Sequence, residues 1–347
     1  MKNKIMTSME RVLTTLSHKE PDRVPLFLLL TMHGAKELGV SIEEYFSKAE
    51  YVAEGQILMQ KKYSNDCYYP FFYAPIEVEA FGAEVIYSDD GPPNSGIPII
   101  SNIEDIRELK APKIKDTPVL KEVLKTIKIL KKQANGEIPI IGVAMSPFSL
   151  PVMQLGFEKY LDLLHFHPEL FNRLMTVNQE FCANWSNAQI EAGATAITYF
   201  DPVSSSSIIP RDLYERTGFE IAKETISKIS GPTATHYASG DCLKIADLLS
   251  KTGTAVVGVS SKEDLSQLKK AFSNKLTVLG NLNGIEMRSW TKSETIKIVK
   301  EAIINGAPGG GFILSDNHGE IPFQVPEETL LLIADTIKSQ GTYPIKI

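Results

Sequence analysis

The sequence has few cysteines and no strong excess of charge. Its three cysteines, Cys67, Cys182 and Cys242, lack metal-knuckle spacing. So sparse and odd a set argues against a disulfide framework and a cysteine-rich zinc site. The net charge is only −6, without a basic block, which disfavours nucleic acid and anionic membranes as partners. The longest apolar run, 24–32, is far short of the roughly 20 residues of a membrane span. We expect a reduced, cytoplasmic protein.

The sequence also lacks the glycine-rich turn that opens a doubly wound nucleotide-binding sheet. Its one glycine cluster, 306–311, precedes a segment of strand character instead of following one. Glycines in that position are more typical of a helix end and a tight entry into the next strand. A phosphate cradle is therefore disfavoured.

What the sequence does contain is a regular alternation of short apolar runs with amphipathic helical segments. Such runs are typical of parallel strands that are covered on both faces. Eight of them with helical crossovers predict an α/β fold, a (β/α)₈ TIM barrel. The expected strands are 24–30, 67–72, 139–145, 195–200, 233–237, 255–259, 277–281 and 312–315.

Two features are added to this rhythm. Extended pieces at 77–87 and 97–100, joined by a turn-rich stretch, predict a hairpin-like insertion near the barrel mouth. A short N-terminal helical extension at 8–16 should close the bottom or the side of the barrel. Since no linker or repeat is visible, we expect one domain over 1–347.

Polar residues at the predicted strand ends form the candidate active site, because barrel chemistry belongs where strands end. Asp201 and His236 end neighbouring strands, and Glu215 lies early in the helix between them. Together they would suit a divalent cation, with His318 as a reserve ligand. The alternative is structural: Asp201 would cap the serine-rich loop after it, Glu215 would be solvated, and His236 would be a core histidine.

Aromatic residues near two adjacent strand ends suggest a substrate pocket. Tyr68, Phe72, Tyr73 and Phe148 would line it, although buried strand packing explains the same density. His33 and Asn281 also lie at strand ends and are candidate substrate-binding residues.

Several motifs, in order along nearly the whole chain, resemble the uroporphyrinogen decarboxylase superfamily. They are Glu-Arg-Val-Leu at 10–13, Glu-Pro-Asp-Arg-Val-Pro at 20–25, the stretch 79–93, Asp-Pro at 201–202 with Ile-Pro at 209–210, and Gly-Asn-Leu at 280–282. The resemblance implies a (β/α)₈ barrel, in agreement with the strand count.

Differences from the two best-known patterns narrow the choice of branch. Decarboxylases carry an arginine-rich segment after the first strand, whereas this chain has Leu-Leu-Thr-Met-His-Gly at 29–34. The pattern of the thiol methyltransferases in the corrinoid-dependent branch is His-x-Cys after strand 5, with a further cysteine after strand 8. Here Ala238 and His318 stand in those places. Zinc-dependent O-demethylases of this branch have the pattern Glu-x14-Glu-x20-His, which this chain resembles. Glu215 and His236 match its second and third positions. The first acid would be Asp201, which has a shorter side chain than Glu and lies one residue closer to Glu215.

The resemblance therefore implies a methyltransferase that moves a methyl group from a methoxylated aromatic compound to the cob(I)alamin of a corrinoid protein. Zn²⁺ on the ether oxygen would stabilise the leaving phenolate. Methanol and methylamines fit the same logic. The alternatives are a methyl-corrinoid:thiol methyltransferase and a non-catalytic barrel that binds a corrinoid protein or tetrapyrrole. The oligomeric state stays open, a homodimer included.

Overall fold

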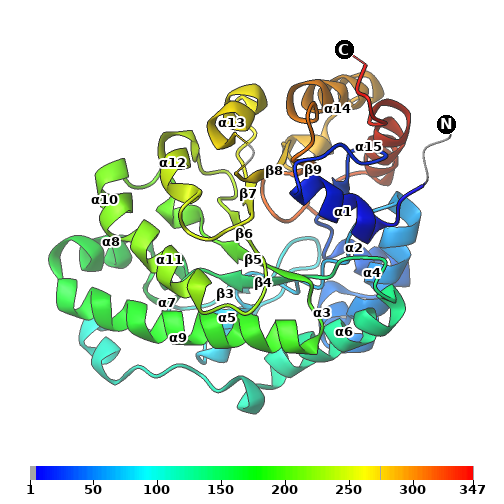
Figure 1. The fold of residues 1–347 in the computed structure, drawn as a ribbon. Helices are drawn as coiled ribbons and strands as arrows, with labels where there is room; N and C mark the ends of the chain where they lie inside the picture. Colours follow the sequence, from blue (N-terminus) through cyan, green and yellow to red (C-terminus); the bar gives the residue numbers. More distant parts are fainter. Residues whose placement is uncertain (1–4, 274, 347) are drawn as a thin grey trace.

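A computed structural model describes residues 5–273 and 275–346. Its centre is a curled, seven-stranded parallel sheet with the order β1-β9-β8-β7-β6-β5-β4 (Figure 1). The strands are β1 (Leu26–Phe27), β4 (Ile141–Met145), β5 (Ala196–Phe200), β6 (Thr233–His236), β7 (Val256–Gly258), β8 (Thr277–Leu282) and β9 (Phe312–Asp316). Seven predicted strands and the TIM-barrel class are thereby confirmed.

Helices surround the sheet and cover its outer face. They are α1 (Ser8–Leu16), α2 (His33–Leu38), α3 (Ile42–Phe46), α4 (Ala49–Tyr63), α5 (Ile76–Ala80), α6 (Pro118–Ala134), α7 (Pro151–Leu155), α8 (Phe157–Phe166), α9 (Pro168–Ala192), α10 (Arg211–Arg216), α11 (Gly218–Ser227), α12 (Ala246–Leu249), α13 (Leu265–Phe272), α14 (Lys292–Gly306) and α15 (Glu327–Gln340). Short 3₁₀ turns are η1 (Ile103–Glu108), η2 (Ile114–Asp116), η3 (Pro202–Ser204), η4 (Leu243–Ile245) and η5 (Glu286–Arg288).

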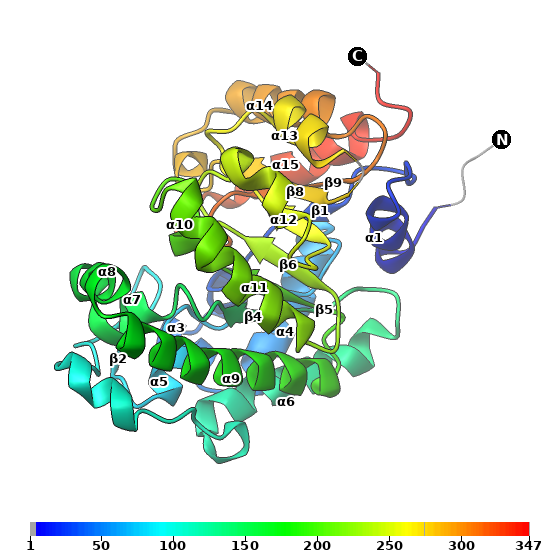
Figure 2. The same cartoon turned by 60° about the vertical axis from the view of Figure 1, so that its left-hand side comes forward.

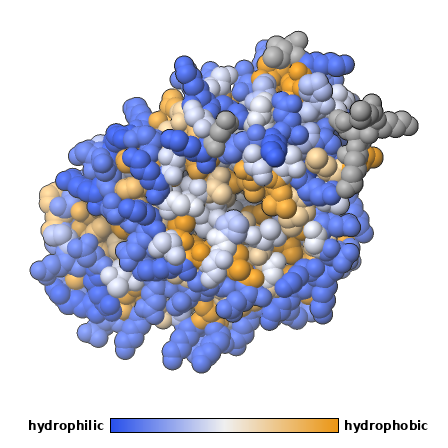
Figure 3. Space-filling model, in the orientation of Figure 1, coloured by the Kyte–Doolittle hydropathy of each residue, from blue (hydrophilic) through white to orange (hydrophobic). Residues whose placement is uncertain are grey.

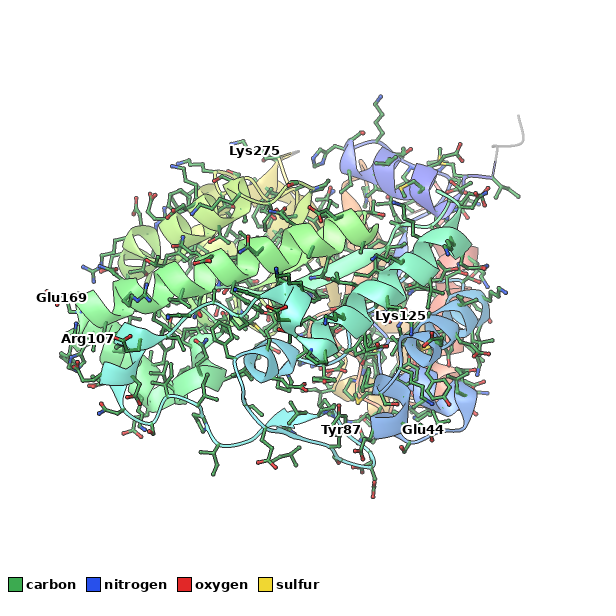
Figure 4. The ribbon with its side chains drawn as sticks, turned by 90° about the horizontal axis from the view of Figure 1, so that it is seen from below. Glu44, Tyr87, Arg107, Lys125, Glu169 and Lys275 are labelled. Carbon is green, nitrogen blue, oxygen red and sulfur yellow. The ribbon has the colours of Figure 1, made fainter. Side chains whose placement is uncertain are left out.

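The outer helices are amphipathic, which explains their placement. In α6, Leu120, Val123, Ile127 and Leu130 are buried, and this spacing forms one apolar stripe. Lys125 lies on the opposite, outer side, as Figure 4 shows, and pairs with Glu50 at 2.8 Å.

The eighth predicted strand, 67–72, is an extended segment that makes only one β-bridge. Tyr68 bridges Ile140 in parallel, and Asp66 donates its backbone N–H to the carbonyl of Leu26 at 2.8 Å. The segment thus lies between β1 and β4 and closes the ring without a regular ladder.

Side chains make the hydrogen bonds that a ladder would make along this seam. Asn65 accepts from the N–H of Leu28 at 2.8 Å and donates to its carbonyl at 3.1 Å. Gln56 donates to the carbonyl of Leu30 and accepts from the N–H of Tyr69, both at 2.8 Å. These bonds satisfy the buried edge of the first strand, as buried backbone groups require.

On the other side of the seam, Gln189 of α9 does the same for β4. Its amide accepts from the N–H of Val143 at 3.0 Å and donates to the carbonyl at 2.8 Å. Glu77 accepts from the N–H of Met145 at 2.7 Å. We call this set of side chains, Gln56, Asn65, Glu77 and Gln189, the seam residues.

The insertion differs in part from its prediction. The hairpin exists as β2 (Val85–Ile86) paired antiparallel with β3 (Asn94–Ser95). However, the first half of the stretch expected to be extended is helix α5, and 97–100 is not a strand. Helix α5 forms here because its buried residues, Ile76, Glu77 and Val78, face the protein interior.

Helix α1 covers the end of the barrel where the strands begin, as the prediction for 8–16 required. Thr7 and Glu10 form a capping box at its start, which fixes the first turn. Figure 2 shows α1 at one end of the strands and α8 and α10 toward the other. We call the α1 end the floor and the opposite end the mouth. Within the described residues, no helix combines the length and the apolar character of a membrane span.

Candidate active site at the barrel mouth

The mouth gathers buried polar atoms that have no hydrogen-bond partner among the described residues. They include both ring nitrogens of His33, Nε2 of His236, Nδ1 of His318, and Oδ1 of Asp316 and Asn317. These residues follow β1, β6 and β9, whose carboxyl ends meet here. Since buried polar groups in folded proteins are nearly always paired, such a concentration makes the mouth the candidate ligand site.

Asp201 lies at this end but is fully engaged by protein groups. Oδ1 accepts from the hydroxyls of Ser146 at 2.5 Å and Ser149 at 2.9 Å, and Oδ2 accepts from Ser204 at 2.5 Å. Burial raises its pKa to about 6, against the opposing effect of the serine hydroxyls. The structural alternative for Asp201 therefore describes it better than metal ligation does.

Glu215 does not reach the mouth. It is exposed on α10, and its charge acts on the neighbouring Arg211. The predicted set of Asp201, Glu215 and His236 is thus not assembled, because the helix turns the Glu215 side chain outward. Across 5–273 and 275–346, no group of three or more His, Cys, Asp or Glu side chains is arranged to hold a metal ion.

His236 is the best-defined functional side chain of the mouth. Its ring stacks on Phe200, with centroids 4.7 Å apart, and leans over Gly258, where any side chain would collide with it. Burial, and then the charge of nearby His318, lowers its pKa to about 3, so the ring is neutral. Nδ1 accepts the backbone N–H of Ala238 at 3.0 Å. The single ring proton therefore sits on Nε2, which becomes an unpaired donor.

Three further ionisable groups lie at or just after the ends of β1 and β9. Burial raises the pKa of Asp316 to about 6, although Oδ2 accepts the backbone N–H groups of His318 and Gly319. Burial raises the pKa of Glu320 to about 7, and Thr31 donates to this carboxyl group. Burial lowers the pKa of His33 to about 3. Shifted acids and neutral imidazoles together are typical of functional sites.

The four aromatic residues expected to line the pocket lie in two other buried clusters. Phe72 and Tyr73 pack on Phe46, with centroids 5.6 and 5.4 Å apart, in a cluster outside the barrel that also contains Tyr68. Phe148 packs on Tyr160 in another buried cluster.

The aromatic residues of the barrel interior include Phe27, Tyr69, Phe71 and Phe200. Phe71 stacks on Phe200 with an angle of 11° between the rings, and Tyr69 donates to the carbonyl of Gly319 at 3.0 Å. For Tyr69 and Phe71, the signal that the sequence offers is the alternation of side chains along the segment 67–72. Successive side chains in an extended segment point to opposite faces, so 67, 69 and 71 face inward while 68 and 72 face the helices.

Asn281 is at its predicted strand end, but its side chain is structural in this arrangement. Its amide donates to the carbonyls of Ser260 and Glu263 at 2.9 and 3.0 Å, which ties β8 to the loop after β7.

The sequence matches the uroporphyrinogen decarboxylase (URO-D) family over residues 7–340. The chain belongs to this family. One relative, "Uroporphyrinogen decarboxylase" of Syntrophotalea carbinolica, is 27% identical over 273 residues, which are 76% of each chain. Another, "Methylcobamide:CoM methyltransferase MtbA" of Methanosarcina acetivorans, is 25% identical and covers 68% of this chain and 71% of its own.

Among solved structures, a "methyltransferase from Methanosarcina mazei" superimposes on this URO-D family chain with a TM-score of 0.87. The match covers 96% of this chain and 99% of the other at 18% identity. At that identity the likeness establishes the fold. The family therefore contains both decarboxylases and corrinoid-dependent methyltransferases among the relatives of this chain.

Proposed function

We propose that this protein is a corrinoid-dependent methyltransferase that demethylates a small methoxylated aromatic compound. The observation that carries the proposal is the Nε2–H of His236, a buried donor without a partner beside aromatic rings at the mouth. It suits a substrate with a flat ring and one oxygen that must leave.

The chain's own residues would contribute as follows. Phe71 and Phe200 would contact the ring of the substrate, as offset aromatic pairs do. The neutral His236 would donate a hydrogen bond from Nε2 to the ether oxygen and stabilise the negative charge that develops there. Neutral imidazoles act as such electrophiles in other enzymes. The corrinoid, supplied by a partner protein, is the methyl acceptor when bound at the mouth.

The residues do not fit the zinc ion that the family resemblance implied. Asp201 is saturated by three hydroxyls, Glu215 faces outward, and the Nδ1–Ala238 bond leaves a proton on Nε2, the nitrogen that a metal would need. We therefore assign no step to zinc, and His236 acts as a hydrogen-bond donor to the leaving phenolate oxygen without giving up its proton.

Two other activities are poorer matches. The stretch after β1, where decarboxylases carry arginines, has the buried His33, so the acidic groups of a porphyrinogen would lack cations. The pattern of the thiol methyltransferases contains two cysteines. In this chain Ala238 and His318 stand in those two places.

The test is methylation of free cob(I)alamin with a panel of methoxyarenes, methanol, methylamines and methylthiols. We expect activity with methoxyarenes. His236→Phe keeps the ring packing but removes the donor, and it should lower kcat by about 10²–10³-fold. His236→Gln restores a donor and should recover part of the loss. Tyr68→Phe, outside the barrel, is the matched control.

Two outcomes would contradict the proposal. One is transfer only from methylcobalamin to a thiol such as coenzyme M, which would support the thiol alternative. The other is stoichiometric zinc, measured by mass spectrometry, that is lost together with activity in His236→Phe, because His236 would then be a ligand. A protein inactive with every donor and acceptor would support the non-catalytic barrel.

A further inference from the structure

The barrel is incompletely filled at its floor. A cavity of about 100 Å³ lies between α1 and the inner faces of the strands. Barrel interiors are normally packed with layers of bulky branched side chains. Here the inward positions on one side of the ring are small, namely Ala196, Thr198, Ala234 and Ala255.

The wall of this cavity is almost entirely apolar. Val12 and Leu16 of α1 close it from below. The other apolar side chains are Leu29 from the chain after β1, Leu279 from β8 and Ile313 from β9. The ring of His236 lines its inner end. The other polar residues of the wall present little polar surface to the cavity, which disfavours a bound water; they are Thr195, Thr198 and Thr233.

The cavity lies close to the surface beside α1. Leu13 lines the cavity and is 53% exposed. Figure 3, which views this face, shows apolar atoms in its middle surrounded by hydrophilic side chains. The cavity is thus near the surface of the floor, at the end of the barrel opposite the mouth.

We propose that the floor cavity is a binding site for one small apolar molecule, enclosed by α1 and touching the underside of His236. Dry apolar cavities of roughly 150 Å³ bind benzene or xenon, so one of about 100 Å³ suits xenon, a small cycloalkane or a short alkyl group. Because the occupant would contact the ring of His236, this second site is joined to the mouth through one side chain.

Xenon and cyclopentane are the probes, applied to the full chain. We expect a saturable ¹²⁹Xe chemical-shift change in NMR, and a rise in Tm of about 1–2 °C with cyclopentane. Tetrahydrofuran has the same ring size with one ether oxygen, and it should bind more weakly because the wall is apolar. Tetrahydrofuran binding as tightly as cyclopentane would overturn the apolar assignment.

Ala234→Leu fills the cavity and should abolish both responses. Ala111→Leu, on the outer segment between η1 and η2, is the matched control and should keep them. If circular dichroism shows that Ala234→Leu is unfolded, the smaller Ala196→Val serves instead. A wild-type protein without a saturable xenon response, or a filled variant with an unchanged one, would overturn the proposal.

Discussion

The two ends of the barrel use polar side chains in opposite ways. At the floor, Arg11 of α1 binds Asp22 and Asp66, each at 2.7 Å, and Arg23 binds Asp66 at 2.7 Å. At the mouth, the ring nitrogens of His33 and Nε2 of His236 are buried with no partner. Polar groups that are paired hold a structure together, whereas groups left unpaired in a buried place are free for a ligand. Substitutions at the floor should therefore cost stability, and substitutions at the mouth should cost activity.

The largest effect on stability is expected from Asp66→Ala at the floor. Asp66 is 1% exposed, and it also accepts the backbone N–H of Leu26 at 2.9 Å. Removing it breaks the salt bridge of Arg23 and one of the two salt bridges of Arg11, which should lower the free energy of unfolding by about 5 kcal/mol. Urea denaturation measures this. Asp247→Ala breaks the exposed pair with Arg211 and should cost less than about 1 kcal/mol. Equal losses in the two variants would contradict the comparison.

The next effect concerns Glu77, a seam residue next to the mouth. Burial raises its pKa to about 8, so the folded state holds this proton more tightly than the unfolded chain. The free energy of unfolding should then fall as pH rises from about 4.5 to about 8, by on the order of 4 kcal/mol. Glu77→Gln cannot titrate and should flatten this part of the profile.

Denaturation between pH 5 and pH 9 tests the Glu77 prediction. Glu104→Gln removes an exposed carboxylate that pairs with Arg107 and should follow the wild-type profile. A Glu77→Gln variant with an unchanged pH slope would place the origin of that slope elsewhere.

Asp201→Asn probes whether the mouth carboxylate is structural. In the wild-type protein, serine hydroxyls donate to both carboxylate oxygens of Asp201. In the variant one of these oxygens is replaced by an amide nitrogen, which is itself a donor, so one hydrogen bond must rearrange. We expect a loss of about 1–2 kcal/mol in stability and no change in metal content. Loss of a bound metal in this variant, measured by mass spectrometry, would restore the ligand hypothesis.

The smallest effect sharpens the distinction between inward and outward side chains. Tyr69→Phe removes the hydrogen bond to Gly319 and should cost about 1 kcal/mol, with reduced methyl transfer because the loop after β9 is loosened. Tyr68→Phe, one residue away on the outer face, should change neither quantity measurably. The reverse ranking would show that the parity assigned to this segment is wrong.

The sequence predicted those features that depend on local pattern. Seven strands follow from continuous apolar runs, and the helix at 8–16 follows from its capping box and apolar stripe. The second strand was predicted but its hydrogen bonding was not, because the partners are side chains from distant segments such as Asn65 and Gln189. The spacing of apolar residues cannot show that side-chain amides replace a backbone ladder.

The places of the candidate residues in the fold were predictable, but their contacts were not. His236 ends β6 and His33 begins α2 after β1, as the expected strand ends implied. Spacing could not show that Glu215 faces outward, since a short helix can present either side, nor that three serines surround Asp201. To find Tyr69 and Phe71, one must know which alternate side chains of the segment 67–72 face the barrel interior. A dense run of aromatic residues does not show which alternate set faces inward.

The seam has a consequence for how the barrel opens. A ring of strands is a closed cooperative unit only if every joint is comparably strong, and here one joint has a few backbone hydrogen bonds, at Asp66 and Tyr68, and otherwise depends on side chains. The strength of this joint therefore depends on side chains that a single substitution can remove. The other joints are backbone ladders, which a side-chain substitution leaves in place as long as the strand itself is kept. The ring should part first at this joint, so amide hydrogen exchange at Leu28 and Val143 would report opening of the barrel before the remaining strands separate.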